Sequence, residues 1–146
     1  MDAITLLKDD HKTVKGLFRK FEQAGDRAYA TKRKLVDKIT EELSVHAAIE
    51  EEIFYPAFLV ATSDKALHHE AEVEHAGAKK LIAEIEDANS RDDYFEAKVK
   101  VLSEMIKHHV NEEEQPGGMF AEARKSEMDL LSLGRELMAR KEQLEE

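Results

Sequence analysis

The sequence contains no cysteine and no tryptophan, and only 2 prolines and 6 glycines occur among its 146 residues. The lack of cysteine excludes disulfides, thiolate metal sites and cysteine nucleophiles. Because 42% of the residues are hydrophobic and 37% are charged, the scarcity of proline and glycine favours a helix-rich globular chain over a disordered or fibrous one. A chain of this length is expected to form one domain of ordinary size.

Long apolar runs and an excess of basic residues are also missing. No stretch of about 18 apolar residues is present, so no membrane span is expected. No basic segment followed by an apolar run stands at the start of the sequence, so we expect no signal peptide and a cytoplasmic location. The formal net charge of −10 argues against nucleic acid as a partner, because contacts to phosphates require a basic face.

Apolar residues recur at steps of three and four along most of the chain, which predicts amphipathic helices. No segment alternates with a period of two, so no strand is expected. A bend is expected in the second helix at Pro56. In chain order, the expected helices run from an N-cap at Asp2 to Gly25, from within 26–31 to about Ala61, from the 62–64 loop to about Asn89, from about Asp93 to the 115–118 turn, and from Met119 to Glu146.

Four long helices joined by short turns predict an all-α fold, an antiparallel up-down-up-down four-helix bundle over residues 1–117. Residues 118–146 are expected to add a C-terminal helix with a less regular apolar stripe and a high density of charge. This extension could pack back across the bundle or meet another subunit in a homo-oligomer. The pattern favours neither arrangement over the other.

A histidine and a glutamate stand four positions apart at His46 and Glu50. This spacing places both side chains on one helix face, about 6 Å apart along the axis. The same face carries Leu43, Ile49 and Ile53, so it should point into the core. An unpaired buried charge costs several kcal/mol, and a bound metal ion would remove that cost.

The pair recurs at His109 and Glu113, as part of an internal repeat. A single histidine precedes each pair at a similar interval, since His11 stands 35 residues before His46 and His75 stands 34 residues before His109. The repeat suggests a pseudo-two-fold axis through the bundle, with a site formed by both halves. Four imidazoles and two carboxylates would then converge on the interior.

This set of side chains predicts a dinuclear metal centre. Two histidines for each ion, two bridging glutamates and a bridging solvent oxygen give each ion about five nitrogen and oxygen donors, which suits iron or manganese better than structural zinc. We predict two iron ions, bridged by glutamate and by an oxo or hydroxo group. The candidate metal ligands are His11, His46, Glu50, His75, His109 and Glu113.

The order H…HxxxE…H…HxxxE, over about residues 4–120, resembles the hemerythrin-like (HHE cation-binding) family of four-helix non-haem di-iron proteins. The flanking Asp10–His11 and Phe54–Pro56 agree with this resemblance. It implies that the same six residues are the metal ligands. It also implies reactions with small oxygen species, since similar bacterial members with six ligands have been described with catalase-like decomposition of hydrogen peroxide and with roles in O2, NO and iron handling.

Two departures from the oxygen-carrying hemerythrins shift the prediction toward catalysis. Ala71 stands where the carriers have a further histidine, and His109 is followed by Glu113 where the carriers have HxxxxD. With one imidazole missing, each iron could keep an open position, and two adjacent open positions favour splitting a peroxide over holding O2 reversibly. We therefore predict a catalase-like enzyme. The alternatives are an O2, NO or iron binding or sensing module, and a helical bundle with a vestigial or zinc-filled site.

Tyr55 is a candidate extra ligand that could fill the place left at Ala71. In an unbroken helix its side chain would face away from His46, and a bend at Pro56 would turn it inward. The other histidines are expected at the surface, and the glutamates beside the motifs are expected to be solvated or to support the ligands. These residues are His68, His69, His108, Glu51, Glu52, Glu112 and Glu114.

Overall fold

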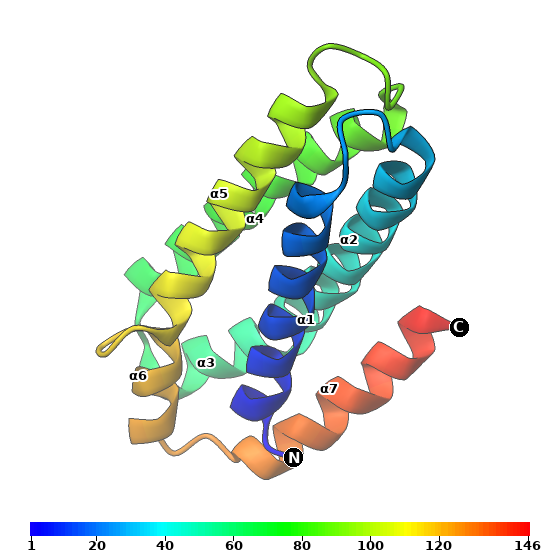
Figure 1. Ribbon diagram of the computed structural model, residues 1–146. Helices are drawn as coiled ribbons and strands as arrows, with labels where there is room; N and C mark the ends of the chain where they lie inside the picture. The colour runs from blue at the N-terminus through cyan, green and yellow to red at the C-terminus, as the bar shows by residue number, and fades with distance from the viewer.

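The computed structural model describes residues 1–146 as helices joined by short turns, without a strand, so the predicted all-α class is confirmed. Four long helices, α1, α2, α4 and α5, lie side by side as a bundle (Figure 1). The helices are α1 (Ala3–Gln23), α2 (Tyr29–Ile49), the π-helical turn η1 (Glu50–Phe54), α3 (Tyr55–Thr62), α4 (Lys65–Asp87), α5 (Phe95–Glu114), α6 (Met119–Lys125) and α7 (Leu130–Glu145). No helix combines the length and the apolar character needed to cross a membrane.

The first helix begins as its sequence predicts. The Asp2 carboxylate accepts a hydrogen bond from the backbone N–H of Thr5 at 2.8 Å, which satisfies one of the unpaired donors of the first turn. The helix ends at Gln23, where Ala24 turns to an extended backbone. Gly25 therefore lies just beyond the helix and is not a left-handed cap.

The predicted bend near Pro56 is present, and its basis is a π-helical turn. Proline has no backbone N–H to donate to the carbonyl four residues earlier. One residue before it, the N–H of Tyr55 donates to the carbonyl of Glu50, which is five residues earlier and not four. This wider turn inserts one extra residue into the helical register, and α3 then departs from the direction of α2 (Figure 1).

The prediction of one continuous helix from Met119 to Glu146 is wrong, because the structure has two helices there, α6 and α7. Ser126 adopts an extended backbone and ends α6. Asp129 then caps α7, since its carboxylate accepts a hydrogen bond from the N–H of Ser132 at 3.1 Å. Serine and aspartate favour such local side-chain bonds over continued helix, and this is the physical reason for the break.

The C-terminal helix packs back on the bundle, where it contacts α1, α2 and η1. Leu137 is fully buried in this contact. Gly134 permits a close approach to the start of the chain, because a Cβ there would stand 2.3 Å from the carbonyl oxygen of Met1. Of the two arrangements considered for this segment, packing across the bundle is the one observed.

The buried apolar residues form two clusters with a polar layer between them. One cluster lies at the end where α3, α6 and α7 meet, and includes Leu7, Ile49 and Phe120. The other fills the opposite end, and includes Val14 and Leu43. Along α1 and α2, the histidines therefore fall at the boundary between the clusters.

Candidate metal centre

The structure brings the six predicted ligand residues together in the polar layer. Each is buried, with no more than 8% of its surface exposed. They form two overlapping groups, and within each group one ligand atom per residue lies within 4.8 Å of the others. One group is His11, His46, Glu50 and Glu113, and the other is Glu50, His75 and His109.

The candidate histidines form two pairs, His11 with His46 and His75 with His109, and Glu50 lies between these pairs. Its Oε1 atom is 3.1 Å from Nε2 of His46 and 3.2 Å from Nε2 of His75. Because it belongs to both groups, its carboxylate is placed to contact two cations at once.

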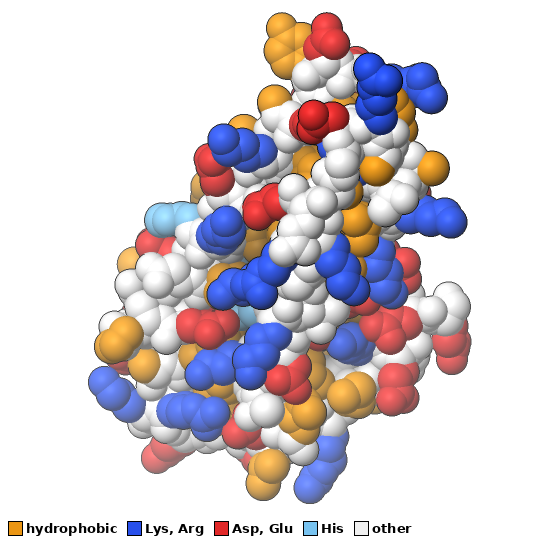
Figure 2. All heavy atoms as spheres, in the orientation of Figure 1, with side chains coloured by type: hydrophobic (Ala, Val, Ile, Leu, Met, Phe, Trp, Pro, Cys, Tyr) orange, Lys and Arg blue, Asp and Glu red, His pale blue; other side chains and the backbone are white.

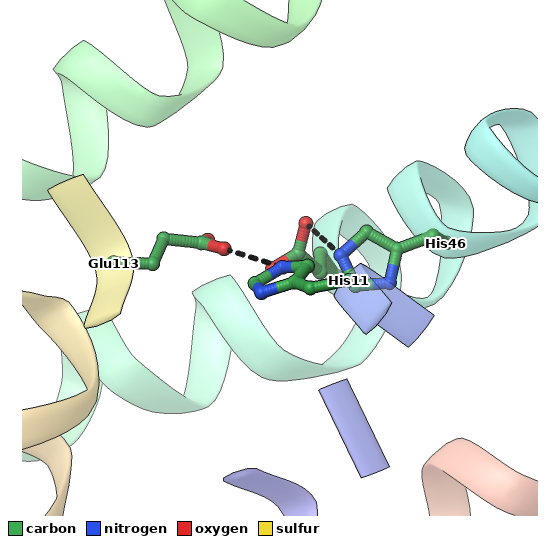
Figure 3. Close-up of side chains that lie close together, drawn as sticks. His11, His46 and Glu113 are labelled. Atoms are coloured by element: carbon green, nitrogen blue, oxygen red, sulfur yellow. Dashed lines mark ion pairs between the residues drawn. The ribbon is translucent and has the colours of Figure 1, made fainter. Parts of the chain in front are cut away.

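Glu113 spans the two pairs from the opposite side of the bundle. Its Oε1 atom is 3.2 Å from Nε2 of His11, and its Oε2 atom is 3.3 Å from Nε2 of His109. Figure 3 shows Glu113, His11 and His46 pointing toward one another from different helices. The two oxygens of one carboxylate therefore face different histidine pairs.

The outer nitrogen of each histidine faces a carboxylate. In the first half of the chain, Nδ1 of His46 donates to Asp10 at 2.8 Å, and Nδ1 of His11 donates to Glu114 at 2.6 Å. Since a carboxylate only accepts hydrogen bonds, a proton resides on Nδ1. In the neutral ring that a metal ion requires, Nε2 would then present its lone pair to the interior.

The second half repeats this arrangement. Nδ1 of His75 donates to Glu51 at 2.9 Å, and Nδ1 of His109 donates to Glu74 at 2.6 Å. Hydrogen bonds of this kind orient the imidazole rings of metal sites and raise their basicity. All four candidate imidazoles are therefore held in the orientation that metal ligation requires.

These supporting carboxylates follow the internal repeat. Asp10 and Glu74 each stand directly before the first histidine of their half. Asp10 accepts a hydrogen bond from His46, and Glu74 accepts one from His109. Glu51 and Glu114 each stand directly after the candidate ligand glutamate of their half. Glu51 accepts a hydrogen bond from His75, and Glu114 accepts one from His11, so each partner lies in the other half. Sequence reasoning overlooked Glu74, although its position directly before His75 matches that of Asp10 and was the available signal.

Five interior-facing atoms of the candidate ligands lie close to one another but make no well-aligned hydrogen bond. They are Nε2 of His11 and His46, both carboxylate oxygens of Glu50, and Oε1 of Glu113. A buried polar atom without a well-aligned partner costs roughly 1–3 kcal/mol. In the metal-free protein, only protonation of the imidazoles that lie 3.1–3.2 Å from these oxygens would offset that cost. Metal cations would satisfy all five atoms at once, and the nitrogen and oxygen donors suit iron or manganese.

Without a metal ion, the carboxylates favour protonated imidazoles. Burial opposes the charged form of His109, but Glu113 beside it raises its pKa to about 10. Burial likewise opposes ionisation of Glu113, but His109 and His11 hold its pKa well below the usual value. The carboxylates that would bind a cation thus take up protons on the neighbouring histidines instead.

Tyr55 points into the centre, because the extra residue of η1 turns its side chain inward. Its hydroxyl donates to Oε2 of Glu113 at 2.7 Å and lies 3.0 Å and 3.2 Å from Nε2 of His75 and His109. It therefore faces the histidine pair next to Ala71, the position at which oxygen carriers have their further histidine. Burial, together with the carboxylates of Glu50 and Glu113, raises the pKa of Tyr55 well above its ordinary value, so the metal-free phenol stays protonated.

The remaining histidines lie outside the two central groups. His69 and His108 are exposed, as predicted. The surface prediction for His68 is wrong, because only 12% of its side chain is exposed. Its ring is covered by Tyr55, with ring centroids 6.4 Å apart.

Comparison with known proteins agrees with this geometry. A family model described as the hemerythrin HHE cation binding domain matches residues 2–116. The chain is also similar to the crystal structure of a hemerythrin HHE cation binding domain-containing protein from Mycobacterium kansasii, with a TM-score of 0.81 and 26% sequence identity over 99% of this chain and 87% of that chain. No curated protein matches the sequence significantly. Because the family match covers most of the sequence, the chain belongs to the hemerythrin HHE cation-binding domain family.

Proposed function

We propose that the centre holds two iron ions and decomposes hydrogen peroxide in a catalase-like reaction. The observation that carries this proposal is the pair of overlapping ligand groups that share Glu50, with unpartnered atoms directed between them. The proposed ligands are His11, His46, Glu50, His75, His109 and Glu113. The bundle over residues 1–117 would be the metal-binding unit, and residues 118–146 an extension packed on it.

Bound iron would supply reversible redox chemistry, by which two molecules of hydrogen peroxide give two of water and one of O2. The protein residues would hold the charge of the ions and exclude bulk water. Glu50 and Glu113 would bridge, because each carboxylate faces both histidine pairs at 3.1–3.3 Å. The four acidic partners of the histidines would keep the rings in place during turnover.

Tyr55 is proposed to act at the His75–His109 side of the centre. Its hydroxyl oxygen lies 3.0 Å from Nε2 of His75, so it is placed to add one oxygen donor to that ion. When not bound, it donates a hydrogen bond to Glu113 at 2.7 Å and restrains that carboxylate. Ala71 has only a methyl group and no atom that could bind this ion, which supports the proposed role of Tyr55.

A binding or sensing role for O2 or NO is the second candidate function. It is favoured by the complete burial of Glu50 and near-complete burial of the histidines, because an enclosed metal pair can hold a small diatomic ligand away from water. The contact of α7 with α1 and η1 would let a changed ligand set alter the position of the tail helix. This role predicts a spectral change on gas binding without turnover.

Oxygen evolution from hydrogen peroxide tests the proposal. Iron-loaded protein should evolve O2 faster than the same concentration of free iron, and His75→Ala should abolish this excess. His69→Ala is the matched control, because His69 is exposed and lies outside the central groups. An iron-loaded sample that evolves no more O2 than free iron, yet changes its spectrum with O2 or NO, would support the binding role instead.

A further inference from the structure

A cavity of about 570 Å³ lies between α2, α4 and α5, and the candidate ligands His46, His75 and His109 line it. Hydrogen peroxide needs far less room, since one water molecule takes about 30 Å³ of liquid volume. Two ions and a bridging oxygen would also fill only a small part of this space. The volume instead falls in the range of roughly 300–1,000 Å³ that is typical of sites for small organic molecules.

The cavity exists because the facing helices carry short side chains. Ala47 and Ala48 line it on α2 beside Leu43. Ala78 lines it on α4 beside Ile82, and Ala83 lies at its exposed edge. Methyl groups leave open the space that longer side chains would fill. The wall is therefore largely carbon, and burial of an apolar group against it is favourable.

The polar groups of the cavity are of two kinds. The buried imidazoles belong to the candidate centre, and the other polar lining residues are exposed or half-buried: Ser44, Glu74, Lys79, Glu86 and His108. Lys79 already donates to Glu51 at 2.6 Å, so its charge is paired and it does not favour an anionic ligand. A matching molecule has an uncharged apolar body and one small polar group that reaches the centre.

The outer surface offers no comparable apolar site on the face shown in Figure 2. Basic and acidic side chains are interspersed there, and hydrophobic groups are small and scattered between them. The apolar residues that line the cavity lie next to the histidines. This location links the cavity to the chemistry of the centre.

We propose that the cavity binds organic hydroperoxides, with the organic group against the alanine wall and the hydroperoxide group directed at the histidines. This inference rests on the proposed function and names a further substrate class for the same site. The reaction balances with hydrogen peroxide as the reductant. The O–O bond of ROOH breaks and takes up two electrons and two protons from hydrogen peroxide, so that ROOH and H2O2 give ROH, H2O and O2.

The test is the binding of cumyl alcohol, the unreactive product of cumene hydroperoxide, to iron-loaded protein by calorimetry. Wild-type protein should bind it, and Ala78→Phe, which fills the cavity, should weaken binding at least about tenfold, a change of about 1.4 kcal/mol. Ala76→Phe is the matched control, since Ala76 is on the same helix but is exposed and outside the cavity lining. It should bind like wild type.

A second variant keeps the test decisive. If Ala78→Phe loses its helical signal or melts early, Ala48→Leu, at a half-buried position of the cavity wall on α2, fills the cavity with a smaller group and should also weaken binding. No binding to wild type, or equal weakening by Ala76→Phe and the filling variants, would overturn the proposal.

The two proposals fail separately. Cumyl alcohol binding without hydrogen peroxide decomposition would contradict the proposed function and leave the cavity as a site for organic molecules. Hydrogen peroxide decomposition without cumyl alcohol binding would contradict only the cavity proposal. In a mixture of cumene hydroperoxide and hydrogen peroxide, O2 forms in either reaction and cumyl alcohol forms only from the organic hydroperoxide. Absence of cumyl alcohol would overturn the substrate class.

Discussion

Lys141 on the C-terminal helix donates a hydrogen bond to the carboxylate of Asp10 at 2.6 Å, and the other oxygen of that carboxylate accepts from Nδ1 of His46 at 2.8 Å. Burial opposes ionisation of Asp10, but His46 and Lys141 together keep its pKa below the usual value. The helix α7 lies beyond residues 2–116, which the family model matches. A residue outside the matched region is thus connected to a candidate ligand.

Replacing Lys141 by Met should weaken metal binding and lower stability. Asp10, which is 5% exposed, would lose its charged partner, and a weakened buried hydrogen bond costs roughly 1–3 kcal/mol. Loss of a group that orients a ligand typically lowers metal affinity about 10- to 100-fold, and we expect the lower end because Lys141 acts through Asp10. Iron affinity by chelator competition and thermal unfolding measure both effects.

Two further variants separate this contact from a general loss of charge. Lys141→Arg should restore most of the affinity, because it keeps a donor to Asp10. Lys125→Met removes a lysine whose side chain is 73% exposed and should change neither quantity. If Lys141→Met behaved like Lys125→Met, the contact between α7 and Asp10 would contribute neither to iron affinity nor to stability.

Replacing Glu50 or Glu113 by Ala should remove both metal ions together. Each carboxylate faces both histidine pairs, so its loss takes a donor from each ion. Metal content per chain should fall from about two to well below one. Glu112→Ala provides the control, since it neighbours Glu113 but is not in the central groups. A Glu50 or Glu113 variant that retained two irons would show that the carboxylates do not bridge.

Replacing Tyr55 by Phe should keep the packing of the ring and remove the hydroxyl. The free energy of unfolding should fall by roughly 1–3 kcal/mol, because Glu113 loses a buried hydrogen-bond donor. If Tyr55 is a ligand, the visible absorption of a ferric phenolate should also disappear in the variant. Tyr94→Phe is the control, as Tyr94 is 70% exposed. Identical stability and spectra for Tyr55→Phe and wild type would exclude any role of the hydroxyl at the centre.

The stability of metal-free protein should fall as the pH rises from about 6.5 to 10. The pKa of His109 is raised to about 10 in the folded state, against about 6.5 in an unfolded chain. A raised pKa gives stability that is fully present below the unfolded value and is lost as the pH rises through the folded value. Urea unfolding at several pH values measures this.

The metal-bound protein should respond in the opposite direction over the same range. Metal ligation requires neutral imidazoles, so iron affinity should rise as the pH increases. Unfolding of metal-free protein that is independent of pH between 6.5 and 9.5 would contradict the strong coupling of His109 to Glu113.

The arrangement of the four long helices was predictable because apolar periodicity reports directly on which face of a helix is buried. The convergence of His46 and His109 on one layer followed from the same periodicity and from the internal repeat. What periodicity does not report is a change of register. The π-helical turn depends on hydrogen bonding around Pro56 and on the packing of Tyr55, so its place could not be read from spacing.

Contacts between helices were the other part that the sequence did not predict. Glu74 and Lys141 reach residues on other helices, and the partners of a surface-type side chain depend on the three-dimensional packing. The break at Ser126 and Asp129 was visible only as two residues that favour caps, within a segment otherwise rich in helix formers. Long-range pairing therefore had to come from the structure.

The number of iron ions per chain tests the proposed dinuclear centre most directly. Protein expressed with supplemented iron and purified without chelators should contain about two iron ions per chain, and His11→Ala should lower this value while His69→Ala should not. Two irons would support the dinuclear centre formed by both halves of the repeat. Fewer than about one iron per chain, or zinc in its place, would contradict it.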